Sequence, residues 1–150
     1  MPKIHEEVVL PCSKEKAFAE MTAVDFAKKS QPDAGMEFET TFKSERLTRY
    51  KMKVGKWELD SEKVIIPEAF TFVTRRTVSS PAGYSLTIQI FEDHENGTLL
   101  KHIEDFEPQE GKERLSDLKS KVNQYLQGVR RYFRGDHHGS ILRMEDKSAT

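Results

Sequence analysis

The feature that most constrains the fold is a long periodic segment near the C-terminus, from Gly111 to Gly135. Its cationic end complements a helix dipole, and Gly135 is a typical helix stop. About 22 residues at about 1.5 Å each make a helix of about 33 Å, long enough to cross a small domain. We therefore expect one helix whose apolar stripe packs on a sheet. Apolar residues recur at three- and four-residue steps, the spacing of one helix face: Leu115, Leu118, Val122, Tyr125, Leu126, Val129, Tyr132 and Phe133.

The chain before this helix is typical of β-strands, with two short helical interruptions near the start. Ser13 can cap the first short helix through its hydroxyl group. From Met36 to Phe106 apolar residues alternate with polar ones, without a helical period. The expected elements are a strand over Lys3–Leu10, helices over Lys14–Met21 and Val24–Lys29, and about six further strands.

A hairpin is predicted at Asn96-Gly97, because this dipeptide favours the two-residue turns that join antiparallel strands. With those two residues as the loop, the strands 84–92 and 98–106 pair in a defined register. The predicted opposite pairs are Glu92 with Lys101, Phe91 with His102, and Ile90 with Ile103.

This order of elements predicts an α+β domain with a curved antiparallel sheet of six to seven strands around the long helix. A sheet that bends around a helix leaves a cavity between them, and we expect function there. The domain is expected to span residues 1–135, and residues 136–150 are expected to be a disordered tail.

Composition limits the possible partners and compartments. The 150 residues correspond to one domain, and the net charge of −1 gives no support for nucleic acid or anionic membrane as a partner. No apolar run is long enough to span a bilayer, and the N-terminus lacks the pattern of a signal peptide. The single Cys12 fits a reducing compartment. We expect a cytoplasmic protein.

The sequence lacks the motifs of several classes of functional site. There is no Gly-rich phosphate loop, no nucleophile elbow, and no paired Cys or His at metal-binding spacing within the expected domain. His137-His138 lies in the expected tail and reads as a solvated pair. We therefore expect neither a metal nor a nucleotide cofactor.

The segment from Trp57 to Phe106 carries a family resemblance. It contains the run Trp57-Glu58-Leu59-Asp60-Ser61-Glu62-Lys63-Val64, then Pro67, Pro81 and Tyr84, and finally Gly97-Thr98-Leu99-Leu100-Lys101-His102 and Asp105-Phe106. The order W-x-x-x-S-E-R-V, a proline, and G-T before a strand ending in D-F is that of the tetracenomycin-type polyketide aromatase/cyclases. The sequence resembles this family, which belongs to the START superfamily, also called SRPBCC, Bet v 1-like or helix-grip.

The resemblance implies a protein that binds a hydrophobic, polyketide-like or aromatic small molecule in the helix–sheet cavity. The enzymatic form of that function is cyclisation or aromatisation of a polyketide by dehydration. Lys63 stands where the family has a pocket arginine, and Arg76 matches a second one, so these are the catalytic candidates. An ammonium group lacks the planar fork of guanidinium, which separates this chain from the family. The ligand-binding candidates are Trp57, Ser61, Phe72, Gln89, His102 and Tyr125.

Two interpretations of the strands between Tyr84 and Phe106 remain open. Polarity alone places Leu86, Ile88, Ile90 and Ile103 on the inner face. The resemblance implies the opposite face, with these residues inward: Ser85, Thr87, Gln89, Phe91, Leu100, His102 and Glu104. The second interpretation leaves an apolar stripe outside, which would suggest a partner surface.

The alternative function is a non-catalytic helix-grip module that acts by binding. Such a module sequesters a toxic natural product for self-resistance, or makes co-chaperone-like protein contacts. In either case we expect a monomer or weak homodimer.

Overall fold

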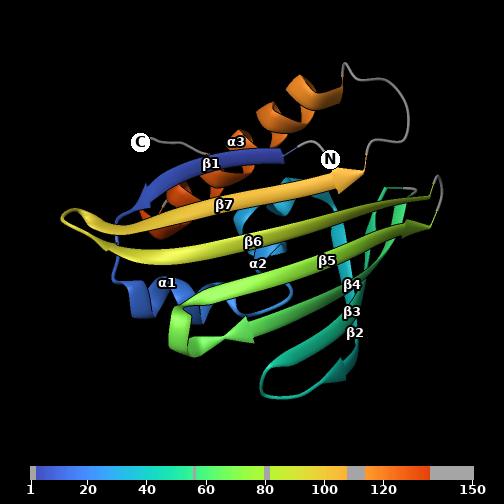
Figure 1. The fold of residues 1–150 in the computed structure, drawn as a ribbon, viewed down its shortest axis with the longest axis horizontal. Coiled ribbons are helices and arrows are strands. Elements are labelled where there is room, and N and C mark those ends of the chain that lie inside the picture. The colour runs from blue at the N-terminus through green and yellow to red at the C-terminus, as the bar shows by residue number, and fades with distance from the viewer. Residues whose placement is uncertain (1–2, 56, 80–81, 108–113, 136–150) are drawn as a thin grey trace.

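The computed structural model describes residues 3–55, 57–79, 82–107 and 114–135. Seven antiparallel strands form one sheet in the order β1-β7-β6-β5-β4-β3-β2. Figure 1 shows this sheet in front, with α2 and α3 behind it. The strands are β1 (Lys3–Leu10), β2 (Met36–Lys43), β3 (Leu47–Val54), β4 (Trp57–Ile66), β5 (Thr71–Ser79), β6 (Ala82–His94) and β7 (Gly97–Glu107). The helices are α1 (Lys14–Met21), α2 (Phe26–Ser30) and α3 (Arg114–Phe133), with 3₁₀ turns η1 (Pro32–Ala34) and η2 (Pro67–Ala69).

The predicted α+β architecture is confirmed, and most element bounds agree with the prediction. The first short helix has the predicted bounds, and its cap is the predicted Ser13, whose Oγ accepts a hydrogen bond from the Lys16 amide at 3.2 Å. The second begins at Phe26 rather than Val24. Helix α3 is described from Arg114, so residues 111–113 of the predicted helix lie outside the described residues. So does the predicted tail, 136–150.

One hydrophobic core lies between the helices and the inner face of the sheet. From α3, Leu126 and Val129 are fully buried and Val122 is nearly so. From α1, the Phe18 ring stacks on Phe72 with centroids 4.5 Å apart. The remaining buried core residues are Ile4, Val8, Leu10, Ala17, Met21, Phe26, Ile65, Phe91 and Leu100. This packing fixes α1 and α3 against the same face of the sheet.

The predicted register of the β6–β7 hairpin is wrong by two residues. His94 pairs with Gly97, so Glu95 and Asn96 form the turn and Gly97 is the first residue of β7. Glycine is required at position 97 because φ is +136°, and a Cβ there would lie 2.1 Å from the Leu10 carbonyl oxygen. The glycine therefore serves the close approach of β1 as well as the turn.

The two-residue shift in register changes the cross-strand partners but not the face of the sheet on which each side chain lies. The observed opposite pairs are Glu92 with Leu99, Phe91 with Leu100, Ile90 with Lys101, Gln89 with His102, and Ile88 with Ile103. Glu92 and Lys101 still form an ion pair, at 3.1 Å, across a diagonal of the outer face. A two-residue shift preserves parity because side chains alternate with a period of two.

The inner face is the one that the family resemblance implied. Thr87, Gln89, Phe91, Leu100 and His102 are buried. The four aliphatic side chains that polarity alone placed inside are only half-buried, on the outer face: Leu86, Ile88, Ile90 and Ile103. The face that packs against the helices is therefore not the one that side-chain polarity alone indicated.

A β-bulge in β2 changes the face of one aromatic residue. The register shifts between Thr40 and Phe42, so Phe42 pairs with Arg49. Regular alternation along the strand would put Phe42 on the same face as Phe38, but the Phe42 side chain is 45% exposed. A bulge adds one residue to one strand, which reverses the alternation beyond it.

No helix within the described ranges is long and apolar enough to cross a membrane.

The face that α3 buries can be tested with a charge substitution. Val122→Asp places an unpaired carboxylate among buried side chains, and we expect it to lower the free energy of unfolding by several kcal/mol. Lys121→Asp, at the neighbouring exposed position, should change it by less than about 0.5 kcal/mol. Urea unfolding measures both. A larger loss for Lys121→Asp would mean that the helix faces the sheet with its other side.

The close approach at Gly97 gives a second prediction. Gly97→Ala combines positive φ with a clash against backbone, so it should destabilise the fold by clearly more than about 1 kcal/mol. Gly55→Ala is the matched control, because φ is +61° there and nothing lies within 4 Å of the added carbon. Thermal unfolding compares the two. Equal losses would show that strain in φ, and not contact with Leu10, is what requires glycine at 97.

Candidate functional site

A band of polar side chains crosses the inner face where the core is otherwise apolar. Its central row runs from strand to strand through directly opposite residues: Thr48, Lys63, Thr74, Thr87 and Glu104. The next row is Tyr50, Ser61, Arg76 and Ser85. Six of these side chains are buried: Thr48, Tyr50, Ser61, Lys63, Thr74 and Thr87. Strand pairing thus aligns polar groups from five strands.

Lys63 is the cation at the centre of the band. Its Nζ donates hydrogen bonds to the carbonyl oxygens of Met21 at 2.5 Å and Thr22 at 3.3 Å, at the end of α1. The same nitrogen lies 4.2 Å from the centre of the Phe72 ring. The carbonyl groups at a helix C-terminus attract a cation, as does the face of an aromatic ring. Lys63 therefore links β4 to α1.

Burial, together with the smaller effect of the positive charge of Arg76, lowers the pKa of Lys63 to about 7. Among the described residues, no carboxylate pairs with Lys63. Glu104, in the same row of the band, is paired with His102. At neutral pH the side chain is therefore present both as ammonium and as amine. Such a group can donate a proton to a bound molecule or accept one.

A second cluster lies beside this row, on β6, β7 and α3. His102 Nε2 lies 3.0 Å from Glu104 Oε1, and His102 Nδ1 lies 3.2 Å from Gln89 Nε2. Gln89 Nε2 also donates to Tyr125 Oη at 3.4 Å. With the amide of Gln89 donating to Nδ1, the histidine proton is on Nε2 and points at the carboxylate. Burial raises the pKa of the Tyr125 hydroxyl, which stays neutral.

Three polar atoms of the band have no hydrogen-bond partner. They are Ser61 Oγ, Arg76 Nε and Thr87 Oγ1, and each atom is buried. Ser61 and Arg76 are directly opposite one another on β4 and β5. Folded proteins pair nearly all such buried groups, since each unpaired one costs about 1 to 3 kcal/mol. The grouping of three unpaired buried polar atoms in one place distinguishes the band from the rest of the core.

Most of the predicted site residues come together in this band. Ser61, Lys63 and Arg76 occupy its centre, and the trio of Gln89, His102 and Tyr125 occupies its side. Phe72 is fully buried in the aromatic core, and the face of its ring contacts Lys63 Nζ of the band. The side chain of Trp57 lies outside the described parts of the structure.

Sequence reasoning missed several members of the band. Tyr50, Thr74 and Thr87 were not predicted as site residues, although Thr74 shares its parity along β5 with Phe72 and Arg76. The carbonyl groups of Met21 and Thr22 were also missed, because no side-chain pattern marks them. The alternation of side chains along a strand could have identified the threonines. A polar residue whose neighbours at both i−2 and i+2 lie on the inner face lies on that face too.

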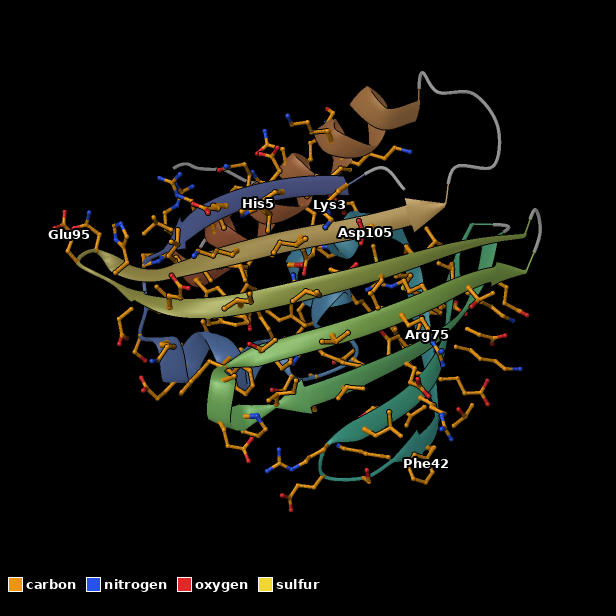
Figure 2. All side chains as sticks on the ribbon, viewed as in Figure 1. Lys3, His5, Phe42, Arg75, Glu95 and Asp105 are labelled. Atoms are coloured by element: carbon orange, nitrogen blue, oxygen red, sulfur yellow. The ribbon has the colours of Figure 1, made fainter. Side chains whose placement is uncertain are left out.

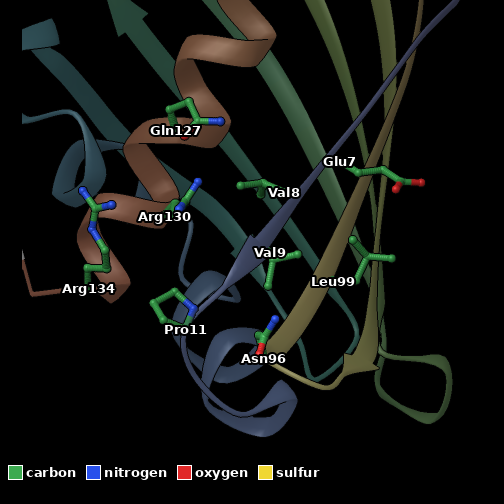
Figure 3. A pocket seen from close by; sticks show the side chains of 9 residues that line it. All are labelled: Glu7, Val8, Val9, Pro11, Asn96, Leu99, Gln127, Arg130 and Arg134. Carbon is green, nitrogen blue, oxygen red and sulfur yellow. The ribbon is translucent and has the colours of Figure 1, made fainter.

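A separate groove of about 620 Å³ lies between β1 and the C-terminal half of α3. Figure 3 shows Gln127, Arg130 and Arg134 on the helix side, with Val8 and Pro11 on the strand side. None of the predicted site residues lines it. The groove is therefore distinct from the polar band.

Among the residues that the structure describes, no three His, Cys, Asp or Glu side chains are grouped so that they could hold a metal ion.

Comparison with known proteins gives structural similarity without sequence similarity. No family model matches the sequence, and no curated protein matches it. Three similar solved structures are the protein Ara h 8.0201, the Aha1 dimer from Colwellia psychrerythraea, and DynU16 from the dynemicin biosynthetic locus.

The similarity to each extends over nearly the whole described chain. Ara h 8.0201 has a TM-score of 0.69 at 13% identity, covering 89% of this chain and 98% of that one. The Aha1 structure has a TM-score of 0.69 at 16% identity, and the match covers 94% of this chain and 100% of that one. DynU16 has 0.68 at 11% identity, covering 88% of this chain and 47% of that one. At these identities the similarity establishes the fold, which is the Bet v 1-like helix-grip fold.

The lowered pKa of Lys63 predicts a pH dependence of stability. Between pH 7 and 10.5 the unfolded chain keeps a lysine proton that the folded chain has lost, so the free energy of unfolding should rise with pH. The contribution is at most about 1.4 kcal/mol per pH unit. Lys63→Met should lack this rise.

Urea unfolding at several pH values, expressed as parent minus variant, isolates the lysine from other groups that titrate in the same range. The exposed Lys51, changed as Lys51→Met, is the control and should follow the parent. A parent curve parallel to that of Lys63→Met would contradict the lowered pKa.

Proposed function

We propose that the protein binds a flat, hydrophobic, polyketide-like or aromatic molecule between the inner face of the sheet and α3, with an acidic or enolic oxygen on the polar band. The observation that carries the proposal is the set of unpartnered buried atoms, Ser61 Oγ and Arg76 Nε, beside the cation Lys63. A ligand oxygen on this band would accept hydrogen bonds that the protein itself leaves unmade.

The charges in the band suit an oxyanion. Lys63 and Arg76 are both cationic donors, and the charge of Arg76 is close enough to lower the pKa of Lys63. An anionic oxygen near both would relieve their mutual repulsion. The apolar walls required for the rest of the ligand are offered by the core side chains of α3, such as Val122 and Leu126.

The same residues could carry a reaction, a polyketide cyclisation with dehydration. His102 would take a proton from the carbon next to one ketone, on Nδ1 in place of its hydrogen bond from Gln89, and Lys63 with Arg76 would hold the enolate oxygen. The enolate carbon would then attack a second ketone of the same molecule, which forms the ring bond and an alkoxide oxygen. Lys63, with a pKa of about 7, would return a proton to that oxygen or to a departing hydroxyl group. The role of His102 depends on Glu104, which orients the ring and would stabilise it when it accepts a proton.

Two further observations support the proposal. The run from Trp57 to Val64 resembles the pocket strand of the polyketide aromatase/cyclases, with Lys63 in place of arginine. DynU16, one of the proteins with the same fold, comes from a biosynthetic locus. The lysine in place of arginine keeps the charge but loses the bidentate fork, which favours binding over catalysis.

Calorimetric titration with anthraquinone-2-sulfonate, a flat molecule with a permanent negative charge, tests the proposal. Lys63→Met and Arg76→Met keep approximate volume and remove one charge-assisted contact, so each should weaken binding about 10- to 100-fold. For the parent, affinity should fall as pH rises through about 7, where Lys63 loses its charge. Lys63→Met should not show this fall.

Lys121→Met is the control, since Lys121 is exposed on α3 and should not affect binding. Absence of binding by the parent, or equal binding by all four proteins, would refute a ligand on the polar band. Binding without any pH dependence would exclude Lys63 from the contact.

A further inference from the structure

The outer face of the sheet carries an apolar row that none of the described helices covers. Val64 on β4 pairs with Val73 on β5, Val73 with Ile88 on β6, and Ile88 with Ile103 on β7. Val64 is 37% exposed and the other three are half-buried. Leu86, Ile90 and Ile66 lie two residues to either side of the row on their strands. We name these seven residues the outer apolar patch.

Charges at one end of the patch are arranged symmetrically about this row. On β7, Lys101 and Asp105 lie two residues before and after Ile103. On β1, Lys3 and Glu7 lie two residues before and after His5, which pairs with Ile103. Each strand therefore carries one cation and one anion, at equal distances from the row. Figure 2 shows Lys3, His5 and Asp105 close together on this side of the sheet.

One of these charged side chains has a carboxylate oxygen that accepts no hydrogen bond. Asp105 Oδ1 is buried and has no hydrogen-bond partner. Lys101, by contrast, already contacts Glu92 at 3.1 Å, and Glu7 lies 3.3 Å from His5 Nε2. Lys3 is directly opposite Asp105 on β1 but makes no hydrogen bond to this oxygen, which leaves the oxygen open to a donor from a second molecule.

We propose that the outer apolar patch is the contact of a homodimer, with the two-fold axis lying along the row from Val64 to Ile103. A rotation about that axis exchanges the positions two residues before the row with those two residues after it. Asp105 then faces the partner's Lys101, Lys3 faces the partner's Glu7, and Leu86 faces the partner's Ile90. The row packs on itself, as an isologous contact requires.

Charge complementarity selects this axis over the alternative two-fold. An axis parallel to the strands, between β5 and β6, would place β4 opposite β7 of the second copy. Glu62 would then face the partner's Asp105, a repulsive pair, and Ile66 would face the partner's Lys101. The row axis avoids the repulsion between the two carboxylates and pairs opposite charges on β7 and β1, although it places Glu62 opposite the partner's Ile66.

The shape of the sheet limits the strength of the dimer. The sheet curves around the helices, so two convex outer faces can meet over a restricted area only. Contacts of this restricted area belong to the weak, transient class. We therefore expect dissociation in the micromolar range, with the polar band of each subunit unaffected because it lies on the inner face.

Sedimentation equilibrium between about 1 µM and 1 mM tests the proposal by charge exchange. Asp105→Lys places two lysines face to face, and Lys101→Asp places two aspartates face to face. Each single change should raise the dissociation constant at least tenfold. The double variant Asp105→Lys/Lys101→Asp restores opposite charges across the axis and should recover dimerisation to within about threefold of the parent.

Ile88→Asp, at the centre of the row, should abolish the dimer, and Lys121→Asp on α3 is the charge-matched control that should leave it intact. Circular dichroism and thermal unfolding of each variant verify that the fold is retained. A parent that stays monomeric at 1 mM overturns the proposal. So does a dimer that all these variants preserve, because its contact would then lie elsewhere.

Discussion

The burial of α3 against the inner face of the sheet is the constraint on which the rest of the structure depends. Leu126 and Val129 lose all contact with solvent, so the sheet must bend around the helix. Phe18 of α1 fills the same space from the side through its stacking on Phe72. Because these side chains exclude water, every polar group on the inner face must find its partners there or remain without them.

The polar band shows both outcomes of that constraint. His102, Glu104, Gln89 and Tyr125 satisfy one another across β6, β7 and α3. Lys63 has only two backbone carbonyl groups and an aromatic ring, without a carboxylate among the described residues, so burial lowers its pKa to about 7. A buried cation without a counter-ion is costly for stability. Its position beside unpartnered polar atoms is the observation on which the proposed ligand site rests.

Along the polar band, the two faces of the sheet have the composition opposite to the one that polarity would assign them. The inner face holds threonines, a lysine and a histidine, while valines and isoleucines lie outside. Val64 is 37% exposed, and the other apolar residues of this outer stripe are half-buried. The proposed ligand site on the inner face and the proposed dimer contact on the outer face are compatible on one sheet, because alternate residues of each strand point to opposite faces.

The sequence by itself determined the elements and their order. The stripe of α3, the cap at Ser13 and the alternation from Met36 to Phe106 are local patterns, and local hydrogen-bond geometry fixes them. Family resemblance identified Lys63, Arg76 and Ser61 as one group. The tertiary structure alone decided the register at Gly97, which depends on contact with Leu10, and the orientation of Phe42 beyond a bulge. It also decided that Glu104 pairs with His102 and that α1 supplies the carbonyl groups for Lys63. These outcomes depend on contacts between residues distant in the chain, and the period of one strand cannot specify which atoms another strand or helix will bring beside it.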